Sequence, residues 1–78
     1  MHARRLLHMT EQHIRELNEQ IAAHRTLMRE LASEGQDVRD HERILQLMIE
    51  ARALAMMHRH LLLKDLSKPA KHAVRAAS

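Results

Sequence analysis

The chain of 78 residues contains no cysteine, phenylalanine, tyrosine or tryptophan. Without cysteine it forms no disulfide and none of the cysteine-containing zinc sites of small domains, and this composition fits a reducing, cytoplasmic location. Without aromatic side chains it has no platform on which nucleic-acid bases stack. Its apolar runs, such as Leu61-Leu62-Leu63, fall far short of the ~20 residues that span a bilayer. We therefore expect no membrane span.

Helix-breaking residues are almost as scarce, because the chain has a single glycine, Gly35, and a single proline, Pro69. The stretches on either side of Gly35 contain neither. This predicts an all-α antiparallel αα-hairpin with a helix over about 10–33, a turn over about 34–37 and a helix over about 38–67. We expect residues 1–9 to be an N-terminal extension or the start of the first helix, with Met9 a candidate natural start, and residues 68–78 to be a basic flexible tail.

The residues at the expected helix ends support these boundaries. Thr10 is placed to cap the first helix with its hydroxyl, and Asp37 is placed to cap the second. Gly35 can adopt the left-handed conformation that closes a helix C-terminus. Pro69 ends the second helix, because the residue before a proline is pushed out of helical geometry.

Apolar residues recur at heptad spacing in both stretches and predict which faces meet in the hairpin. If the chain folds back symmetrically about the turn, His24 lies opposite Met48, and His58 lies opposite Ile14. Likewise, His41 pairs with Leu31. The predicted seam consists of Ile14, Leu17, Ile21, His24, Met28 and Leu31 from the first helix and Ile44, Met48, Ala51, Ala55 and Leu62 from the second.

One flank of this hairpin is rich in leucine. It holds Leu6, Leu27, Leu47, Leu54 and Leu61, interrupted by His13 and Gln20. A single core in a chain this small contributes only about 3–5 kcal/mol, so an unpartnered leucine flank predicts association. We expect a non-enzymatic protein-interaction module that homodimerises into a four-helix bundle; a different protein bound to the same flank is the open alternative.

The charge of the chain lies mainly in its ends. The net charge is +3, yet residues 10–66 carry eight Lys or Arg against all ten acidic residues. The remaining basic residues are Arg4, Arg5, Lys68, Lys71 and Arg75. Basic tails of this kind leave nucleic-acid binding as an alternative function, although the helices themselves show no basic face and disfavour it.

The eight histidines are the other candidates for chemistry. His13, Glu16 and His58 are a candidate metal set, since helical bundles bind metals through histidine and carboxylate side chains on facing helices. His24 at a mid-seam position is expected to be a packed histidine; the alternatives are a residue that fixes the register and one that responds to pH. No nucleophile with a partnered base is present, so we expect no catalytic residue, no enzyme and no cofactor.

Several short segments of the chain carry a resemblance: His13-Ile14, Ile21-Ala22-Ala23-His24-Arg25, Leu31, Gly35-Gln36-Asp37, Leu45 and His58-Arg59. Through them the chain resembles small two-helix proteins of unknown function from alpha-proteobacteria, rhizobia especially. The resemblance spans about residues 11–63 and implies a short intracellular hairpin, with no catalytic or binding residue carried over.

Overall fold

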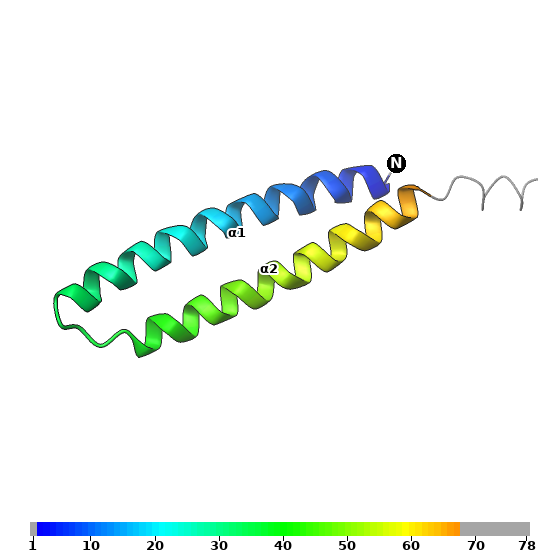
Figure 1. The fold of residues 1–78 in the computed structure, drawn as a ribbon. Coiled ribbons are helices and arrows are strands. Elements are labelled where there is room, and N and C mark those ends of the chain that lie inside the picture. Colours follow the sequence, from blue (N-terminus) through cyan, green and yellow to red (C-terminus); the bar gives the residue numbers. More distant parts are fainter. Residues whose placement is uncertain (1, 68–78) are drawn as a thin grey trace, which may run out of the picture.

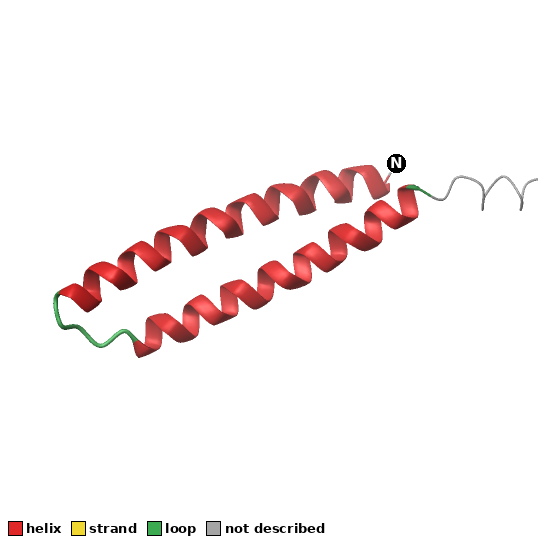
Figure 2. Cartoon of the chain, in the orientation of Figure 1, coloured by secondary structure: helices red, strands yellow, loops and turns green. Residues whose placement is uncertain are grey.

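A computed structural model describes residues 2–67, which form two antiparallel helices, α1 (His2–Ser33) and α2 (Arg39–Leu66) (Figures 1 and 2). The all-α hairpin predicted from the sequence is confirmed. The predicted tail, together with the stop at Pro69, lies outside the described residues. None of the helices in the described part of the chain has the length and apolar character needed to cross a membrane.

The first helix starts at His2 and not at about residue 10, so residues 2–9 are the start of this helix, the second of the two alternatives predicted for them. Residues 2–9 contain no helix breaker, and Leu7 extends the half-buried stripe of α1 toward its N-terminus. Thr10 is therefore not a cap. It lies within α1 with its side chain buried between the helices.

The turn begins at Gly35, which has a positive φ of 75°. The N–H of Gly35 donates to the carbonyl of Ala32 at 3.0 Å, and the N–H of Gln36 donates to the carbonyl of Leu31 at 2.9 Å. This pair of bonds is the Schellman motif, which satisfies carbonyls left open at a helix C-terminus. The motif requires a left-handed residue, and that explains why the only glycine stands here.

Asp37 stabilises the start of α2 from one position further upstream than a conventional cap. The residue directly before the helix is Val38, whose side chain makes no capping bond. The Oδ1 atom of Asp37 accepts from the backbone N–H of Arg39 at 3.0 Å. Asp40 and Glu42 then place negative charge in the first turn of α2, where the helix dipole favours it.

The buried face of α1 follows the predicted heptad. Ile14, Leu17 and Ile21 are buried, and Ile21 is the most enclosed large side chain at 2% exposed. His24, Met28 and Leu31 continue the stripe as half-buried residues toward the turn. The heptad pattern of α1 is strong because polar residues occupy most of the other positions.

The buried face of α2 is rotated relative to the prediction. Residues facing α1 recur every three or four positions, and we call this set the inner stripe. Predicted seam residues Met48, Ala55 and Leu62 belong to it, and Ala51 packs at its edge, whereas Ile44 is 43% exposed and lies outside it. The inner stripe consists of Val38, His41, Leu45, Met48, Arg52, Ala55, Arg59 and Leu62.

The aliphatic stems of two arginines explain this rotation. The predicted face would have placed Ala51 and His58 in the seam, and both offer little apolar surface. On the observed face Leu45, Arg52 and Arg59 are half-buried instead, as long basic side chains allow, and the Nε of Arg59 is buried without a hydrogen-bond partner. The Nη1 group of Arg52 donates to Asn18 Oδ1 across the polar flank at 3.0 Å.

The pairing of the helices is shifted along their axes. His41 lies next to His24, about two turns from the predicted partner Leu31. His58 lies next to Thr10, about one turn from Ile14. Figure 1 shows the cause: α2 begins short of the end of α1, because the connecting residues run back alongside α1 before the helix starts.

Candidate interaction surface

A second apolar stripe on α2 lies beside the inner stripe, with its large apolar side chains exposed. Its members are again spaced alternately by three and four residues, so they form a continuous row along the helix. Leu47, Leu54 and Leu61 are 61%, 67% and 55% exposed, and Ile44 extends the row toward the turn. We call this row the outer stripe; it consists of Ile44, Leu47, Ala51, Leu54, His58 and Leu61.

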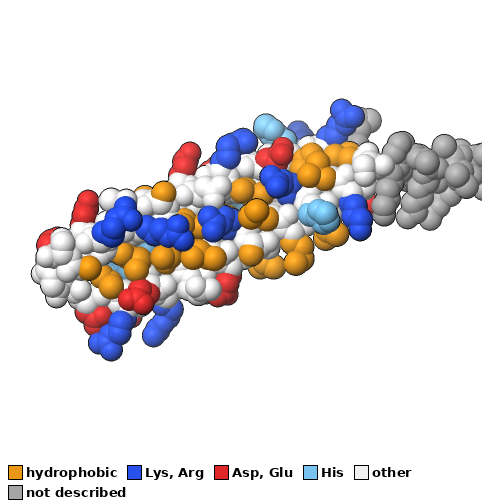
Figure 3. Space-filling view, in the orientation of Figure 1, with side chains coloured by type: hydrophobic (Ala, Val, Ile, Leu, Met, Phe, Trp, Pro, Cys, Tyr) orange, Lys and Arg blue, Asp and Glu red, His pale blue; other side chains and the backbone are white. Residues whose placement is uncertain are grey.

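Helix α1 contributes apolar side chains beside the outer stripe. Leu6 and Leu27, predicted from the sequence to lie on this flank, are exposed, and Met9 adds a third exposed side chain. Gln20 and His13 lie between them and are exposed as well. Figure 3 shows one face of the hairpin, on which apolar side chains run from the turn to the opposite end, called here the open end.

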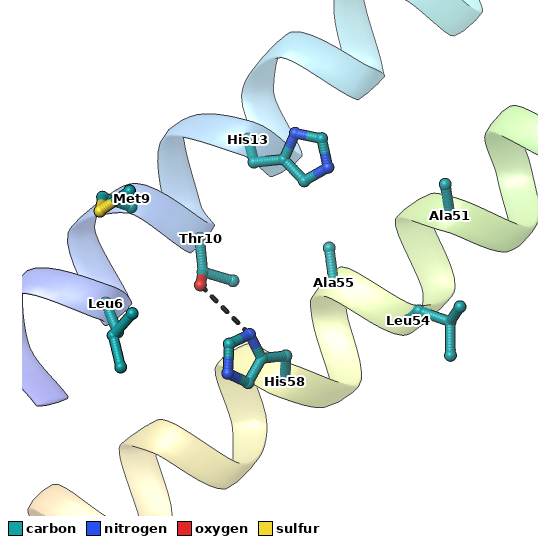
Figure 4. A pocket seen from close by; sticks show the side chains of 8 residues that line it. All are labelled: Leu6, Met9, Thr10, His13, Ala51, Leu54, Ala55 and His58. Carbon is teal, nitrogen blue, oxygen red and sulfur yellow. Dashed lines mark hydrogen bonds between the residues drawn. The ribbon is translucent and has the colours of Figure 1, made fainter.

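A groove of about 520 Å³ opens between the helices toward the open end (Figure 4). Alanines on α2 create it, because Ala51 and Ala55 are too short to fill the space between the larger side chains around them. Polar atoms are few: Thr10 Oγ1 and His58 Nδ1 lie 3.4 Å apart across the seam. The groove is lined by Leu6, Met9, Thr10, His13, Ala51, Leu54, Ala55 and His58.

The predicted metal set does not form. His13, Glu16 and His58 are all exposed, and over residues 2–67 no group of three or more His, Asp or Glu side chains is placed to hold a metal ion. Figure 4 shows His13 and His58 on opposite helices, with the Nδ1 of His58 directed at Thr10. His58 therefore belongs to the groove as a polar lining residue.

His24 and His41 form a pair near the turn. His24 Nε2 lies 2.8 Å from the backbone carbonyl of His41, which can only accept, so this nitrogen carries a proton. The two rings are tilted, with centroids 5.2 Å apart. The Nδ1 of His41 is buried and has no hydrogen-bond partner. The pair links α1 to α2 near the turn, and His24 lies next to His41 instead of the predicted Met48.

One ion pair forms within residues 2–67, and it lies in the turn, away from the apolar flank. Arg39 Nη2 and Asp37 Oδ2 are 2.7 Å apart on exposed side chains. Hydrogen bonds from the Arg39 side chain, and then from its backbone N–H, hold the pKa of Asp37 below its ordinary value. The same side-chain contact raises the pKa of Arg39. This pair stabilises the start of α2 and is remote from the groove.

Sequence reasoning found the leucines of the flank and missed two of its members. Ile44 was placed in the hairpin seam, although its spacing from Leu47 and Ala51 is the signal that assigns it to the outer stripe. Met9, predicted to lie in an N-terminal extension or at the start of the first helix, was not assigned to the flank. The predicted basic residues Lys68, Lys71 and Arg75 lie outside the described part of the chain.

Comparison with protein-family models, with curated proteins and with solved structures finds no match to this chain.

Proposed function

We propose that this hairpin is a non-enzymatic interaction module that homodimerises through its leucine-rich flank into a four-helix bundle. The observation that carries the proposal is the outer stripe of α2, a heptad row whose large apolar side chains, Ile44, Leu47, Leu54 and Leu61, are 43–67% exposed. A helix with two apolar stripes is typical of the interior of a bundle, where it packs against two neighbours.

The hairpin buries little apolar surface compared with what its exposed leucines could bury, and this supports an obligate partner. Only five hydrophobic side chains are buried in the hairpin: Ile14, Leu17, Ile21, Ala55 and Leu62. Full burial of a leucine is worth about 1.5–3 kcal/mol, so the more than half-exposed Leu47, Leu54 and Leu61 each leave roughly 1–2 kcal/mol unrealised. These three side chains together match the ~3–5 kcal/mol expected from the entire core of so small a domain.

A second copy of the chain fits the outer stripe for two reasons. The row runs from Ile44 to Leu61 and is centred on the middle of α2, so a copy related by a two-fold axis covers it along its whole length. The row also contains no Lys, Arg, Asp or Glu, so self-association brings no such charges together at its centre. Leucine side chains of the copy can enter the groove beside Ala51 and Ala55.

Paired glutamate substitutions test this proposal. Leu47→Glu with Leu54→Glu places two charges in the outer stripe without lowering helix propensity much. Wild-type protein should scatter light with twice the chain mass of 9.1 kDa, and the double variant should be monomeric and largely unfolded at micromolar concentration by circular dichroism.

A matched control separates the stripe from the helix as a whole. Gln46→Glu with Ala53→Glu has the same spacing and the same added charge, but both positions are exposed and outside the two stripes of α2. This variant should remain dimeric and helical. A wild-type chain that is a well-folded monomer at micromolar concentration contradicts the proposal.

A further inference from the structure

Charge is distributed unequally along the hairpin. The half next to the turn, residues 18–51, carries seven acidic side chains and four arginines; the open half, residues 2–17 and 52–67, carries six Lys or Arg and three acidic side chains. The hairpin is thus negative by three charges at one end and positive by three at the other. Exposed apolar side chains of the flank lie in both halves, so this charge asymmetry concerns orientation and not affinity alone.

Helix α1 carries its terminal charges against its own dipole. Its first turn contains no acidic residue and its last turn contains no basic one. Instead, Arg4 and Arg5 lie beside the positive N-terminal end, and Glu30 lies beside the negative C-terminal end. Charges in these positions destabilise an isolated helix by a few tenths of a kcal/mol or more each. An external group of opposite sign at each end would offset this cost.

The ends of α2 carry complementary charges. Asp40 and Glu42 stand in its first turn and Lys64 stands in its last. When two copies of α2 run antiparallel through their outer stripes, the acidic start of one lies beside Lys64 of the other. The acidic turn end of each hairpin then also lies beside Arg4 and Arg5 of its partner.

From these charges we infer that the dimer is antiparallel, with α2 packed against α2 of the second copy and the turn of each hairpin lying over the open end of the other. The inference rests on the proposed homodimer and specifies its orientation. The parallel arrangement places both acidic turns together and both basic open ends together. Because the axes of packed helices are about 8–10 Å apart, which is about one Debye length at physiological salt, salt does not fully screen the difference between the two orientations at the ends of α2.

Spin labels measure this orientation directly, because the chain has no cysteine and any introduced one is unique. Arg43→Cys places a label near the turn end of α2, and Glu50→Cys places one near its middle; both side chains are exposed and outside the outer stripe. In the antiparallel dimer the labels at residue 43 are roughly 30 Å apart, given a rise of about 1.5 Å per residue. The labels at residue 50 are much closer, since the axes of packed helices are about 8–10 Å apart.

Each outcome of the distance measurement by pulsed dipolar spectroscopy decides one point. A long distance at residue 43 with a short one at residue 50 supports the antiparallel dimer. Short distances at both positions overturn it and leave the homodimer standing in parallel form. Long distances at both exclude pairing through the outer stripe. Absence of dipolar coupling at both shows a monomer, which refutes the proposed homodimer itself.

Discussion

Two isoleucines of α1 and α2 provide a matched test of what covers the outer stripe. Ile21 is enclosed between the helices at 2% exposed, and Ile44 is 43% exposed on the outer stripe. Replacement by alanine removes the same atoms at both positions. It also changes helix propensity equally, so this contribution cancels when the two variants are compared.

The expected costs follow from burial. At about 0.8 kcal/mol per buried methylene, Ile21→Ala loses about 2.4 kcal/mol of transfer free energy, and the cavity left behind raises the cost into the usual range of about 2–5 kcal/mol. For an isolated hairpin, Ile44→Ala loses only about 1.4 kcal/mol, because 43% of the side chain already contacts water. If a second copy covers the outer stripe, Ile44→Ala should cost nearly as much as Ile21→Ala.

Urea denaturation followed by circular dichroism, at two protein concentrations at least tenfold apart, measures both free energies of unfolding. We expect the two variants to differ by less than about 1 kcal/mol per chain, and the unfolding midpoint of all three proteins to rise with concentration. The reasoning is refuted if Ile44→Ala costs about 1.4 kcal/mol or less while the midpoint is independent of concentration. Ile21→Ala serves as the internal control, since its cost is high in either case.

Two further predictions concern the turn. Gly35→Ala should lower the free energy of unfolding by about 1 kcal/mol, because Gly35 has a left-handed φ of 75° and no atom within 4 Å of an added Cβ offers a steric cause. Gly35→Asn should lower the free energy of unfolding by less in the same urea titration. An unchanged urea midpoint for Gly35→Ala would contradict the left-handed assignment. Asp37 has a pKa lowered by Arg39, so its contribution is complete above the unfolded carboxyl pKa of about 4 and is lost as pH falls through the lower folded value. Asp37→Asn should therefore slightly lower the thermal midpoint at pH 7 and leave it unchanged at about pH 2, and a constant difference across this range would argue against the ion pair.

The sequence predicted the hairpin because its breakers and its α1 heptad are unambiguous. Gly35 could be assigned to the helix end from its conformational freedom alone, and Ile14, Leu17 and Ile21 are separated by clearly polar positions. The prediction that Thr10 caps the first helix is wrong. A threonine can either cap a helix or lie buried inside one, and the sequence does not distinguish the two cases; the contact of Thr10 with His58 in the structure does.

The face of α2 could not be predicted in the same way, since the helix carries two apolar rows. Counting apolar side chains favours a row through Ala51, whereas the structure buries the row that includes Arg52 and Arg59. Their aliphatic stems count as polar in a residue pattern and as apolar in packing. The shift of the two helices along their axes could not be predicted either, because it depends on the path of residues 34–38 and not on the helix sequences.

The short connection at Gly35 also has a kinetic consequence. Closing a loop of this size takes on the order of 10–100 ns, and helix growth takes nanoseconds per residue. We therefore expect the contacts next to the turn, including His24 with His41, to form first and pairing to proceed toward His58 and Thr10. Intramolecular folding of this kind is fast, so the slow step in assembling the folded state should be the encounter of two chains, and its rate should scale with protein concentration.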